Sequence, residues 1–483
     1  MRDSVVQRIL GLLLMTFSLT MLPPVFISFL FADHTWYAFL GGFGVTLTAG
    51  CATWLPARRA REEMRLRDGF LVVALFWVVL GLFGSAPFML AQDLEMSPTD
   101  AVFESMSGLT TTGATVLVGL DRLPESILYY RQQLQWLGGM GIIVLAVAVL
   151  PMLGVGGMQL YRAETPGPVK DTKLTPRITE TAKALWYVYL GITATCAIAY
   201  WLAGMGVFDA IVHSFSTVAI GGFSTHDLSI AYFDSLLIEM VTVVFMFIGG
   251  INFSLHFLAW RRTTLRNYLA DPEFIAYTTV LGLLTILVVA FLYAAGEYES
   301  LSQAFTKGLF QAVSIGTTTG FTTADYQVWP GSLPLMLILA SFIGGCAGST
   351  GGGMKVIRWL LIYKQGVREV MRLVHPSAQI PVKLGDKAVP FRVVDSVWGF
   401  FSVYVVLFGV MMVVVMTTGL DQVTSFAAVA ASMNNLGPGL GDVAYNFTGV
   451  NDTVKWVSVA AMLFGRLEIF TLLVLLTPAF WQR

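Results

Sequence analysis

The chain has 483 residues, of which 56% are hydrophobic and 12% are charged, and its net charge is -1. Soluble domains usually carry about 25% charged residues, so this composition excludes an ordinary soluble protein and requires a lipid bilayer around most of the surface. The near-zero net charge does not itself indicate a partner, and we expect no nucleic acid.

Apolar runs long enough to cross a bilayer, roughly 20 residues each, recur along almost the whole chain. We predict ten spans, at residues 9–31, 37–56, 70–91, 142–153, 184–203, 236–260, 274–295, 333–343, 397–418 and 454–476. The first run lacks a small-residue cleavage pattern and is followed by another span, so we interpret it as a retained helix and not as a signal peptide. The pattern predicts an all-α, multi-pass membrane protein.

Basic residues in alternate loops predict the orientation. With the N-terminus inside, most of the 29 Lys and Arg fall on one face, in segments 2–8, 58–67, 162–183, 261–266 and 355–392. The opposite face holds Arg122, Arg131, Lys307 and Lys455 among carboxylates. Because loops rich in Lys and Arg stay in the cytoplasm, both termini are predicted to be cytoplasmic.

Residues typical of enzymes are missing from the sequence. Cys51, Cys196 and Cys346 lie in or beside hydrophobic runs, without the spacing of a disulfide or a metal site. There is no Gly-Lys-Thr phosphate-binding loop and no arrangement of nucleophile and base. The sequence therefore predicts neither an enzyme, nor an ATP-driven pump, nor an organic cofactor.

Four short segments between predicted spans align without gaps when one glycine of each is placed in register. They begin at Ser105, Ser214, Ala312 and Val429, and the aligned glycines are Gly113, Gly222, Gly320 and Gly437. The period is close to a hundred residues, which indicates an internal repeat. We predict two extra N-terminal helices in 1–67 and four repeats in 68–165, 166–265, 266–385 and 386–483, the third carrying an intramembrane gating loop.

A second register follows in the span after each segment. Its paired positions are Gly138 and Gly139, Gly249 and Gly250, Gly344 and Gly345, and Gly465 and Arg466. Each repeat is therefore predicted to be span, half-helix, glycine loop, span, with the four repeats arranged pseudo-symmetrically around one central pore. The alternative is that these small residues only let helices pack closely in lipid, but such motifs recur at helical spacing, unlike these loops.

A ring of backbone carbonyls can replace the water around a cation without adding a fixed charge that would trap the ion. Turning carbonyls toward one axis requires backbone angles that glycine adopts easily, and half-helices would direct their partly negative C-terminal ends at the same place. The predicted selectivity filter, which would bind potassium, comprises Thr111, Thr112, Gly113, Ile220, Gly221, Gly222, Thr318, Thr319, Gly320, Asn435, Leu436 and Gly437.

Two exceptions to the repeat lie beyond these loops. The last span of repeat three is interrupted by six glycines in ten residues, Gly344, Gly345, Gly348, Gly351, Gly352 and Gly353, and no stable helix would continue through them. In repeat four, Arg466 replaces a glycine inside an apolar span, where a charge is costly and usually functional. The alternatives are a glycine-rich contact between subunits and an internal salt bridge between Arg466 and Glu468.

On the four loops, the Gly344 to Gly353 strip and the sequence Gly465-Arg-Leu-Glu468, the whole chain resembles the Trk/Ktr/HKT superfamily of potassium transporters, and specifically its bacterial TrkH-type membrane subunits. The resemblance implies potassium uptake across the bacterial inner membrane, with the glycine strip and Arg466 as a gate under the filter. It also implies a homodimer and a separate cytoplasmic nucleotide-binding regulatory ring, TrkA-like. In potassium channels the filter reads Thr-Val-Gly-Tyr-Gly; here only the central glycine recurs in all four loops.

A gated pore and a symporter driven by sodium or protons remain the two alternatives for transport. A symporter requires a second cation site built from carboxylates at membrane depth, and Glu239 and Glu468 are the candidates. Near the filter, His213 and His226 could sense pH, and Asp227 and Glu104 could attract cations at the mouth. The ordinary interpretation of the two histidines is that they are polar anchors at a membrane face.

Overall fold

The computed structural model describes residues 3–59, 66–144, 178–467 and 469–481. An N-terminal pair of spans precedes the repeats. Helix α1 (Asp3–Ser18) continues through η1 (Leu19–Met21) into α2 (Leu22–Phe31), and α3 (Trp36–Ala57) returns alongside. A β-carbon on Gly11 would lie 2.8 Å from the carbonyl oxygen of Gly50, so the glycines let α1 and α3 approach closely.

The four repeats follow the N-terminal pair in chain order. Repeat one contains α4 (Leu66–Gly84), α5 (Ala86–Leu90), η2 (Gln92–Leu94), α6 (Pro98–Leu109), η3 (Leu120–Arg122) and α7 (Glu125–Val144). Repeat two contains α10 (Ile178–Leu202), α11 (Val207–Val218), η6 (Ser229–Phe233), α12 (Leu236–Gly249) and α13 (Phe253–Arg262), and the short α14 (Arg266–Leu269) opens repeat three.

Repeat three contains α15 (Pro272–Ala294), α16 (Leu301–Gly316), η7 (Tyr326–Val328), α17 (Leu333–Ser341) and α18 (Val356–Val374), followed by a hairpin of β1 (Lys383–Leu384) and β2 (Lys387–Ala388). Repeat four contains α19 (Phe391–Met416), α20 (Gln422–Met433), η8 (Gly441–Val443), α21 (Asp452–Arg466), α22 (Ile469–Leu476) and α23 (Pro478–Trp481). The fold is all-α apart from this short antiparallel hairpin.

Six helices of the described residues are long and apolar enough to cross a membrane. They confirm six of the ten predicted spans, and they run over Ser4–Phe31, Trp36–Ala57, Asp68–Leu90, Lys183–Leu202, Pro272–Ala294 and Phe391–Met416. The predicted span 236–260 is not one straight helix, because α12 and α13 meet at 96°. The break falls at Gly250–Asn252, where Asn252 caps the new helix through Ser254 N.

The other three predicted spans are also not single long helices in the described residues. Most of 142–153 lies outside them, and α7 begins already at Glu125. Helix α17 has nine residues and ends where the glycines begin, because glycine stabilises a helix poorly. In repeat four, α21 ends at Arg466 and α22 starts at Ile469.

Helices α6, α11, α16 and α20, here called the pore helices, are the half-helices of the prediction. They have 12, 12, 16 and 12 residues, too few to span a bilayer. Ser97, Ser300 and Asp421 cap three of their N-termini with side-chain oxygens. Most residues of their last turns are buried, so the chain that follows each helix emerges inside the protein.

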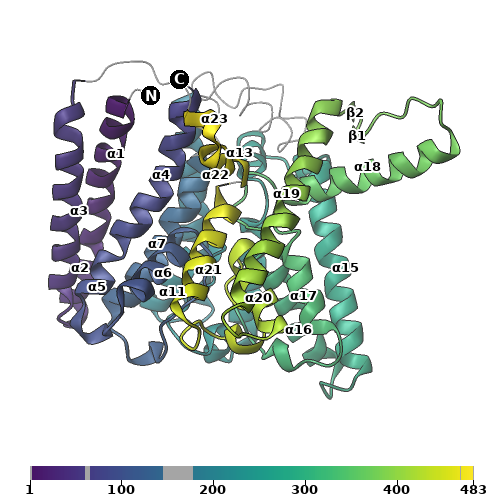
Figure 1. The fold of residues 1–483 in the computed structure, drawn as a ribbon. Helices are drawn as coiled ribbons and strands as arrows, with labels where there is room; N and C mark the ends of the chain where they lie inside the picture. Colours follow the sequence, from purple (N-terminus) through teal and green to yellow (C-terminus); the bar gives the residue numbers. More distant parts are fainter. Residues whose placement is uncertain (1–2, 60–65, 145–177, 468, 482–483) are drawn as a thin grey trace.

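Helix α18 leaves the bundle and projects sideways, and the chain returns from its far end to the hairpin, which lies near the bundle (Figure 1). Its beginning and the hairpin share a small apolar core with the glycine strip and α19. This core comprises Ala347, Ile357, Leu361, Val382, Leu384, Val394 and Val397. The end of the bundle that carries α18 also carries the start of α1 and α23 (Figure 1).

Candidate functional site

Each pore helix passes into its glycine loop through the same kind of backbone hydrogen bond. The residue before the central glycine donates its amide to a carbonyl of the helix five positions earlier. These bonds run from Thr112 to Ser107 at 2.8 Å, from Gly221 to Ser216 at 2.8 Å, from Thr319 to Ser314 at 2.7 Å and from Leu436 to Ala431 at 2.8 Å. The amides before the central glycines are therefore engaged by the pore helices.

The four loops also share an alternating backbone. Their first predicted filter residues, Thr111, Ile220, Thr318 and Asn435, have φ of 51°, 53°, 69° and 53°, and the central glycines have φ from 80° to 97°. The residue between them has negative φ in every loop. A left-handed β-branched residue such as Ile220 is rare and strained, and such residues concentrate at functional sites.

The loops contact one another as a closed ring in chain order. A β-carbon on Gly113 would lie 2.1 Å from Gly221 O, one on Gly222 2.1 Å from Thr319 O, one on Gly320 2.1 Å from Leu436 O, and one on Gly437 2.7 Å from Thr112 O. Each central glycine thus faces the carbonyl that precedes the next central glycine. The absence of a side chain at these four positions is what lets the ring close.

The carbonyls of this ring are buried but mostly not used inside the protein. Thr112, Thr319 and Leu436 are 0% exposed, and within the described ranges their carbonyl oxygens accept no hydrogen bond. Buried carbonyls are normally paired, so unpaired carbonyls gathered in one ring are suited to hold a cation. The fourth oxygen, of Gly221, accepts a bond of 2.7 Å from Gln135 Nε2.

Polar side chains of α7 support the second loop from behind. Besides its bond to Gly221, Gln135 accepts from Phe223 N at 3.1 Å, and Gln132 Nε2 donates to Phe223 O at 2.9 Å. Both glutamines are buried in a helix that passes through the protein interior. The polar stretch Arg131-Gln-Gln-Leu-Gln135 is a sequence signal for this support, and our sequence analysis did not use it.

A buried ion pair lies beside the same wall. Arg131 Nε donates to Glu104 Oε1 at 2.7 Å, and the two side chains are 1% and 0% exposed. Glu104 also accepts from Val116 N, and Arg131 donates to Ser224 O, at 3.0 and 3.1 Å. The pair therefore ties the first loop to the second. Glu104 does not attract cations at the mouth, as the sequence suggested, because Arg131 neutralises it and it is not exposed.

Glu104 lies nine residues before the central glycine of its loop, and the same position is polar in repeats two and three. His213 occupies that position in repeat two, where Nε2 lies 2.9 Å from Ser224 Oγ, and Gln311 occupies it in repeat three, where Nε2 donates to Ala324 O at 3.3 Å. Both side chains are fully buried. His213 is thus a support of its loop and not a polar anchor at the membrane face.

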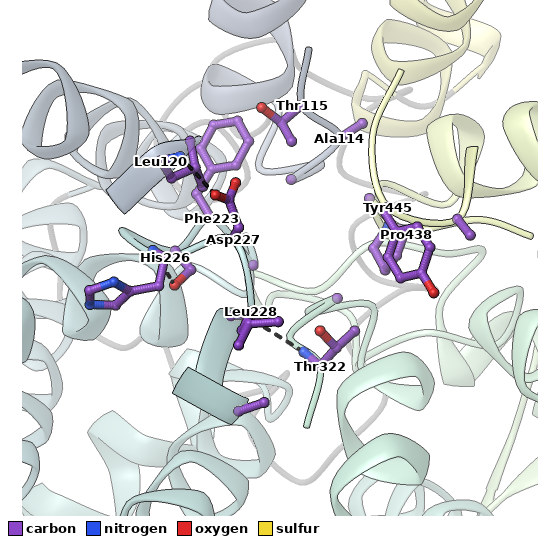
Figure 2. A pocket seen from close by; sticks show the side chains of 18 of the residues that line it. Ala114, Thr115, Leu120, Phe223, His226, Asp227, Leu228, Thr322, Pro438 and Tyr445 are labelled. Atoms are coloured by element: carbon purple, nitrogen blue, oxygen red, sulfur yellow. Dashed lines mark hydrogen bonds between the residues drawn. The ribbon is translucent and has the colours of Figure 1, made fainter. Parts of the chain in front are cut away.

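A cavity of about 420 Å³ opens on one side of the ring. All four central glycines line it, together with residues that follow them, including Ala114, Phe223 and Pro438, and Figure 2 shows these around the cavity. Asp227 and Asp325 add carboxylates to its wall. Asp227 accepts from Leu120 N at 3.1 Å, as Figure 2 shows, and Asp325 accepts from the Tyr445 hydroxyl. The carboxylates would attract cations toward the ring.

The glycine strip, residues 344–353, lies against the residues at the ends of the pore helices. Gly352 N donates to Thr318 Oγ1 at 2.7 Å, Gly353 N donates to Asn434 O at 3.0 Å, and Thr350 Oγ1 donates to Val218 O at 2.8 Å. A β-carbon on Gly352 would lie 2.0 Å from Asn434 O. The strip therefore contacts repeats two, three and four directly below the ring, and its glycines allow this close approach.

Arg466 joins the strip to the first loop. Its guanidinium donates to Thr350 O at 3.1 Å, to Gly351 O at 3.5 Å and to Thr111 Oγ1. The side chain is 8% exposed, and in the part of the chain described here its Nε has no partner. The predicted bonds from Arg466 to strip carbonyls are thus present. Glu468, the alternative partner, lies outside the described residues.

The structure brings the predicted filter and gate residues together at one place. The twelve filter residues are the four loops of the ring, and the six strip glycines and Arg466 lie next to them. Glu239 is not available as part of a second cation site, because it accepts from Lys307 Nζ at 2.6 Å. Of the described residues, no three His, Cys, Asp or Glu side chains form a cluster that could hold a metal ion.

A sequence model of the TrkH family, described as cation transport protein, matches residues 37–483. The chain belongs to the TrkH family. It is 61% identical over 99% of both chains to the Trk system potassium uptake protein TrkH of Halomonas elongata, and 54% identical, again over 99% of both, to the protein of that name from Escherichia coli K12. It is therefore a transport protein and not an enzyme.

A solved structure of the family matches the whole fold. The crystal structure of the potassium transporter TrkH from Vibrio parahaemolyticus is 56% identical, with a TM-score of 0.93 over 100% of each chain. The predicted fold is confirmed: this TrkH family member is an all-α, multi-pass membrane protein with four pseudo-symmetric helix–pore loop–helix repeats around one pore and two extra N-terminal helices.

Proposed function

We propose that this chain carries potassium ions across the bacterial inner membrane through the ring of four loops, as the membrane subunit of a Trk potassium uptake system. The observation that carries the proposal is the closed ring of buried carbonyls, three of which accept no bond from the described residues. Oxygen ligands at close range replace the water around a potassium ion without a fixed charge. The relatives' printed names, which specify potassium uptake, support the choice of ion.

The proposed path begins at the cavity of about 420 Å³, where Asp227 and Asp325 raise the local concentration of cations. The ion then loses its water to the carbonyls of the filter, Thr111 to Gly113, Ile220 to Gly222, Thr318 to Gly320 and Asn435 to Gly437. The pore helices direct their partly negative C-terminal ends at the same place. Potassium is the cargo of this site and not a resident cofactor.

The glycine strip and Arg466 are proposed to be the gate. The strip lies across the path at the inner end of the filter, and the Arg466 charge repels a cation that approaches it. Hydrogen bonds from Arg466 to Thr350 and Gly351 hold the strip in this position. Opening therefore requires that these bonds break and that the strip moves aside.

A passive gated pore accounts for the described residues better than symport does. The buried carboxylates of Glu104 and Glu239 are neutralised by Arg131 and Lys307, so neither is available for a driving ion. Sodium- or proton-coupled symport remains the second candidate, since Glu468 lies outside the described residues. The repeat boundaries at 68, 166, 266 and 386 are part of the proposal.

The assembly is proposed to be a homodimer that binds a cytoplasmic, TrkA-like nucleotide-binding ring. Helix α18 projects from the bundle and exposes apolar side chains, with Val370, Leu373 and Val374 at 64%, 83% and 68% exposed, so a second subunit would cover it. Both termini and α18 lie on the cytoplasmic side, where the basic loops place them.

Ion flux in liposomes tests the proposed function. The purified chain is reconstituted with and without a TrkA-like ring, and the uptake of potassium and sodium is compared under imposed sodium and proton gradients. Potassium flux that follows the potassium gradient alone supports the gated pore. Uphill potassium movement driven by sodium or protons establishes symport instead, and no potassium flux in any condition contradicts the proposal.

A further inference from the structure

Glu273 is a buried carboxylate that no part of the proposed path uses. It is the second residue of α15 and is 2% exposed. Its Oε1 accepts from Ala347 N at 2.7 Å and from Ile357 N at 3.3 Å. Ala347 lies in the glycine strip, and Ile357 lies in the first turn of α18. The carboxylate of Glu273, on α15, therefore joins the strip to α18.

The bonds of Glu273 differ in kind from the other bonds of the strip. The N-terminal half of the strip is otherwise held by backbone bonds, from Cys346 N to Gly250 O at 2.8 Å and from Phe253 N to Gly348 O at 3.0 Å at the break between α12 and α13, and from Val356 N at the start of α18 to Gly345 O at 3.1 Å. Of the described residues, no other carboxylate bonds the strip. A buried carboxyl group is costly unless its oxygens accept hydrogen bonds, and Glu273 meets this need with the two amides.

The surroundings of Glu273 connect this point to the cytoplasmic surface. Lys355, at the start of α18, lies close enough to interact electrostatically with the carboxylate and also donates to Gly351 O. Ala347 and Ile357 share their apolar core with Leu384 of the hairpin and Val394 of α19. A displacement of α18 or the hairpin would therefore reach the strip at Ala347.

We propose that Glu273 is the positioning residue of the gate, which anchors the glycine strip to α18 and keeps the two moving as one unit. The anchor deepens the gate described under Proposed function and rests on it for its role in transport. When the carboxylate holds both amides, the strip stays against the filter. When α18 moves, the same bonds draw Ala347 away with it.

The native thiol of Cys346 provides a direct test, because it lies beside Ala347 and is 1% exposed. In a chain that carries Cys51→Ala and Cys196→Ala, Cys346 is the one remaining thiol, and its rate of modification by a small methanethiosulfonate reports opening of the strip. Glu273→Ala removes the acceptor of both amides, so the rate is expected to rise at least about tenfold. Glu273→Gln keeps an oxygen acceptor at the same place and should give a smaller rise.

Glu239→Ala is the matched control, since it also removes a buried carboxylate but one that is paired with Lys307, not with the strip. Its Cys346 rate should stay at the level of the parent chain. If Glu273→Ala does not elute as a monodisperse peak, Glu273→Asp replaces it, because the shorter side chain retains the charge but withdraws the oxygen from Ala347 N. Rates in the folded Glu273 variants equal to the control would overturn the proposal.

Potassium flux measured on the same samples separates the anchor from the gate. If Cys346 becomes reactive and potassium flux without the TrkA-like regulatory ring also rises, both the anchor and the gate are supported. If Cys346 becomes reactive while flux is unchanged, the anchor stands, and the strip is not the gate. Unchanged Cys346 reactivity with raised flux contradicts the anchor alone.

Discussion

The α-carbon of Gly113 faces the carbonyl oxygen of Gly221 so closely that a β-carbon on Gly113 would lie 2.1 Å from it. No real β-carbon tolerates this distance, and both atoms belong to the backbone, so a larger residue must displace the ring itself. The same relation recurs from each repeat to the next. The geometry of the ring is thus held by four contacts that only glycine permits.

Serine at a central glycine should therefore lower the preference for potassium over sodium. At Gly113, Gly222 and Gly320 the added atom meets an oxygen at 2.1 Å, whereas at Gly437 the distance is 2.7 Å, so Gly437→Ser should have the mildest effect. Backbone strain of about 1–3 kcal/mol per site corresponds to a change in preference of roughly 5- to 150-fold. Competitive potassium and sodium uptake into liposomes measures it.

Gly119→Ser is the control for this series. Gly119 also has positive φ, at 69°, but a β-carbon there would meet no atom within 4 Å. It tests the cost of the backbone angle without the clash, and ion preference should stay unchanged. If all four filter variants behave like Gly119→Ser, the ring does not select the ion.

Replacing Arg466 should raise potassium flux when no TrkA-like regulatory ring is bound. Arg466→Ala removes both the repelling charge and the bonds to Thr350 and Gly351, so the strip leaves the filter more often. Arg466→Lys keeps the charge but loses the planar fork of donors. Its flux should therefore lie between the flux of wild type and that of Arg466→Ala. The preference for potassium over sodium should change little, because the ring of four loops is intact. Equal or lower flux in monodisperse Arg466→Ala would mean that the residue only holds the structure together.

Breaking the pair of Glu104 and Arg131 should destabilise the fold more than removing both charges. Arg131→Met leaves a buried, unpaired carboxylate, which costs about 3–5 kcal/mol, and adding Glu104→Gln should recover much of it. Thermal unfolding in detergent measures both variants. Lys455→Met is the comparison, because its pair with Asp100 is more exposed and should cost about 1 kcal/mol or less. Additive losses in the double variant would refute the coupling.

The stability of the outer mouth should depend on pH through His226. Burial of the His226 imidazole opposes its protonation. Hydrogen bonds and charges of Asp209 and Asp121 outweigh this effect and raise the pKa of His226 above its ordinary value. Because the folded-state pKa is raised, the stabilisation is complete below about pH 6.5 and is lost as pH rises through the folded-state pKa. The difference in melting temperature between wild type and His226→Gln should thus be largest near pH 6. A difference that grows with pH would contradict this assignment.

The orientation can be tested by labelling single cysteines from outside intact cells. In a chain without its three native cysteines, Glu297→Cys and Asp442→Cys should react with an impermeant reagent. Asp386→Cys, in the turn of the β1–β2 hairpin, should react only after the cells are opened, because the basic loops predict a cytoplasmic hairpin. The reverse pattern would show that the topology is inverted.

The sequence alone was sufficient for the class of protein, the repeats and the identity of the loops. Hydrophobic runs report the solvent directly, and a backbone that needs positive φ selects glycine at the same place in each copy, so Gly113 and its three counterparts are visible without a structure. The strip and Arg466 were visible because each departs from its repeat. The spans were less predictable: a run such as 236–260 is apolar throughout and does not reveal that it bends by 96° at Asn252.

Only the tertiary structure decided which groups far apart in the sequence meet. Glu104 and Arg131, Gln135 and Gly221, and Glu273 and Ala347 are 27, 86 and 74 positions apart. A polar residue in an apolar run signals that a partner exists, but its identity depends on how the helices pack. The order in which the four loops close, each glycine beneath the next carbonyl, is likewise a property of the assembled backbone. Contacts between distant backbone atoms do not depend on side-chain chemistry. The sequence therefore indicates them only through the glycines that allow the close approach.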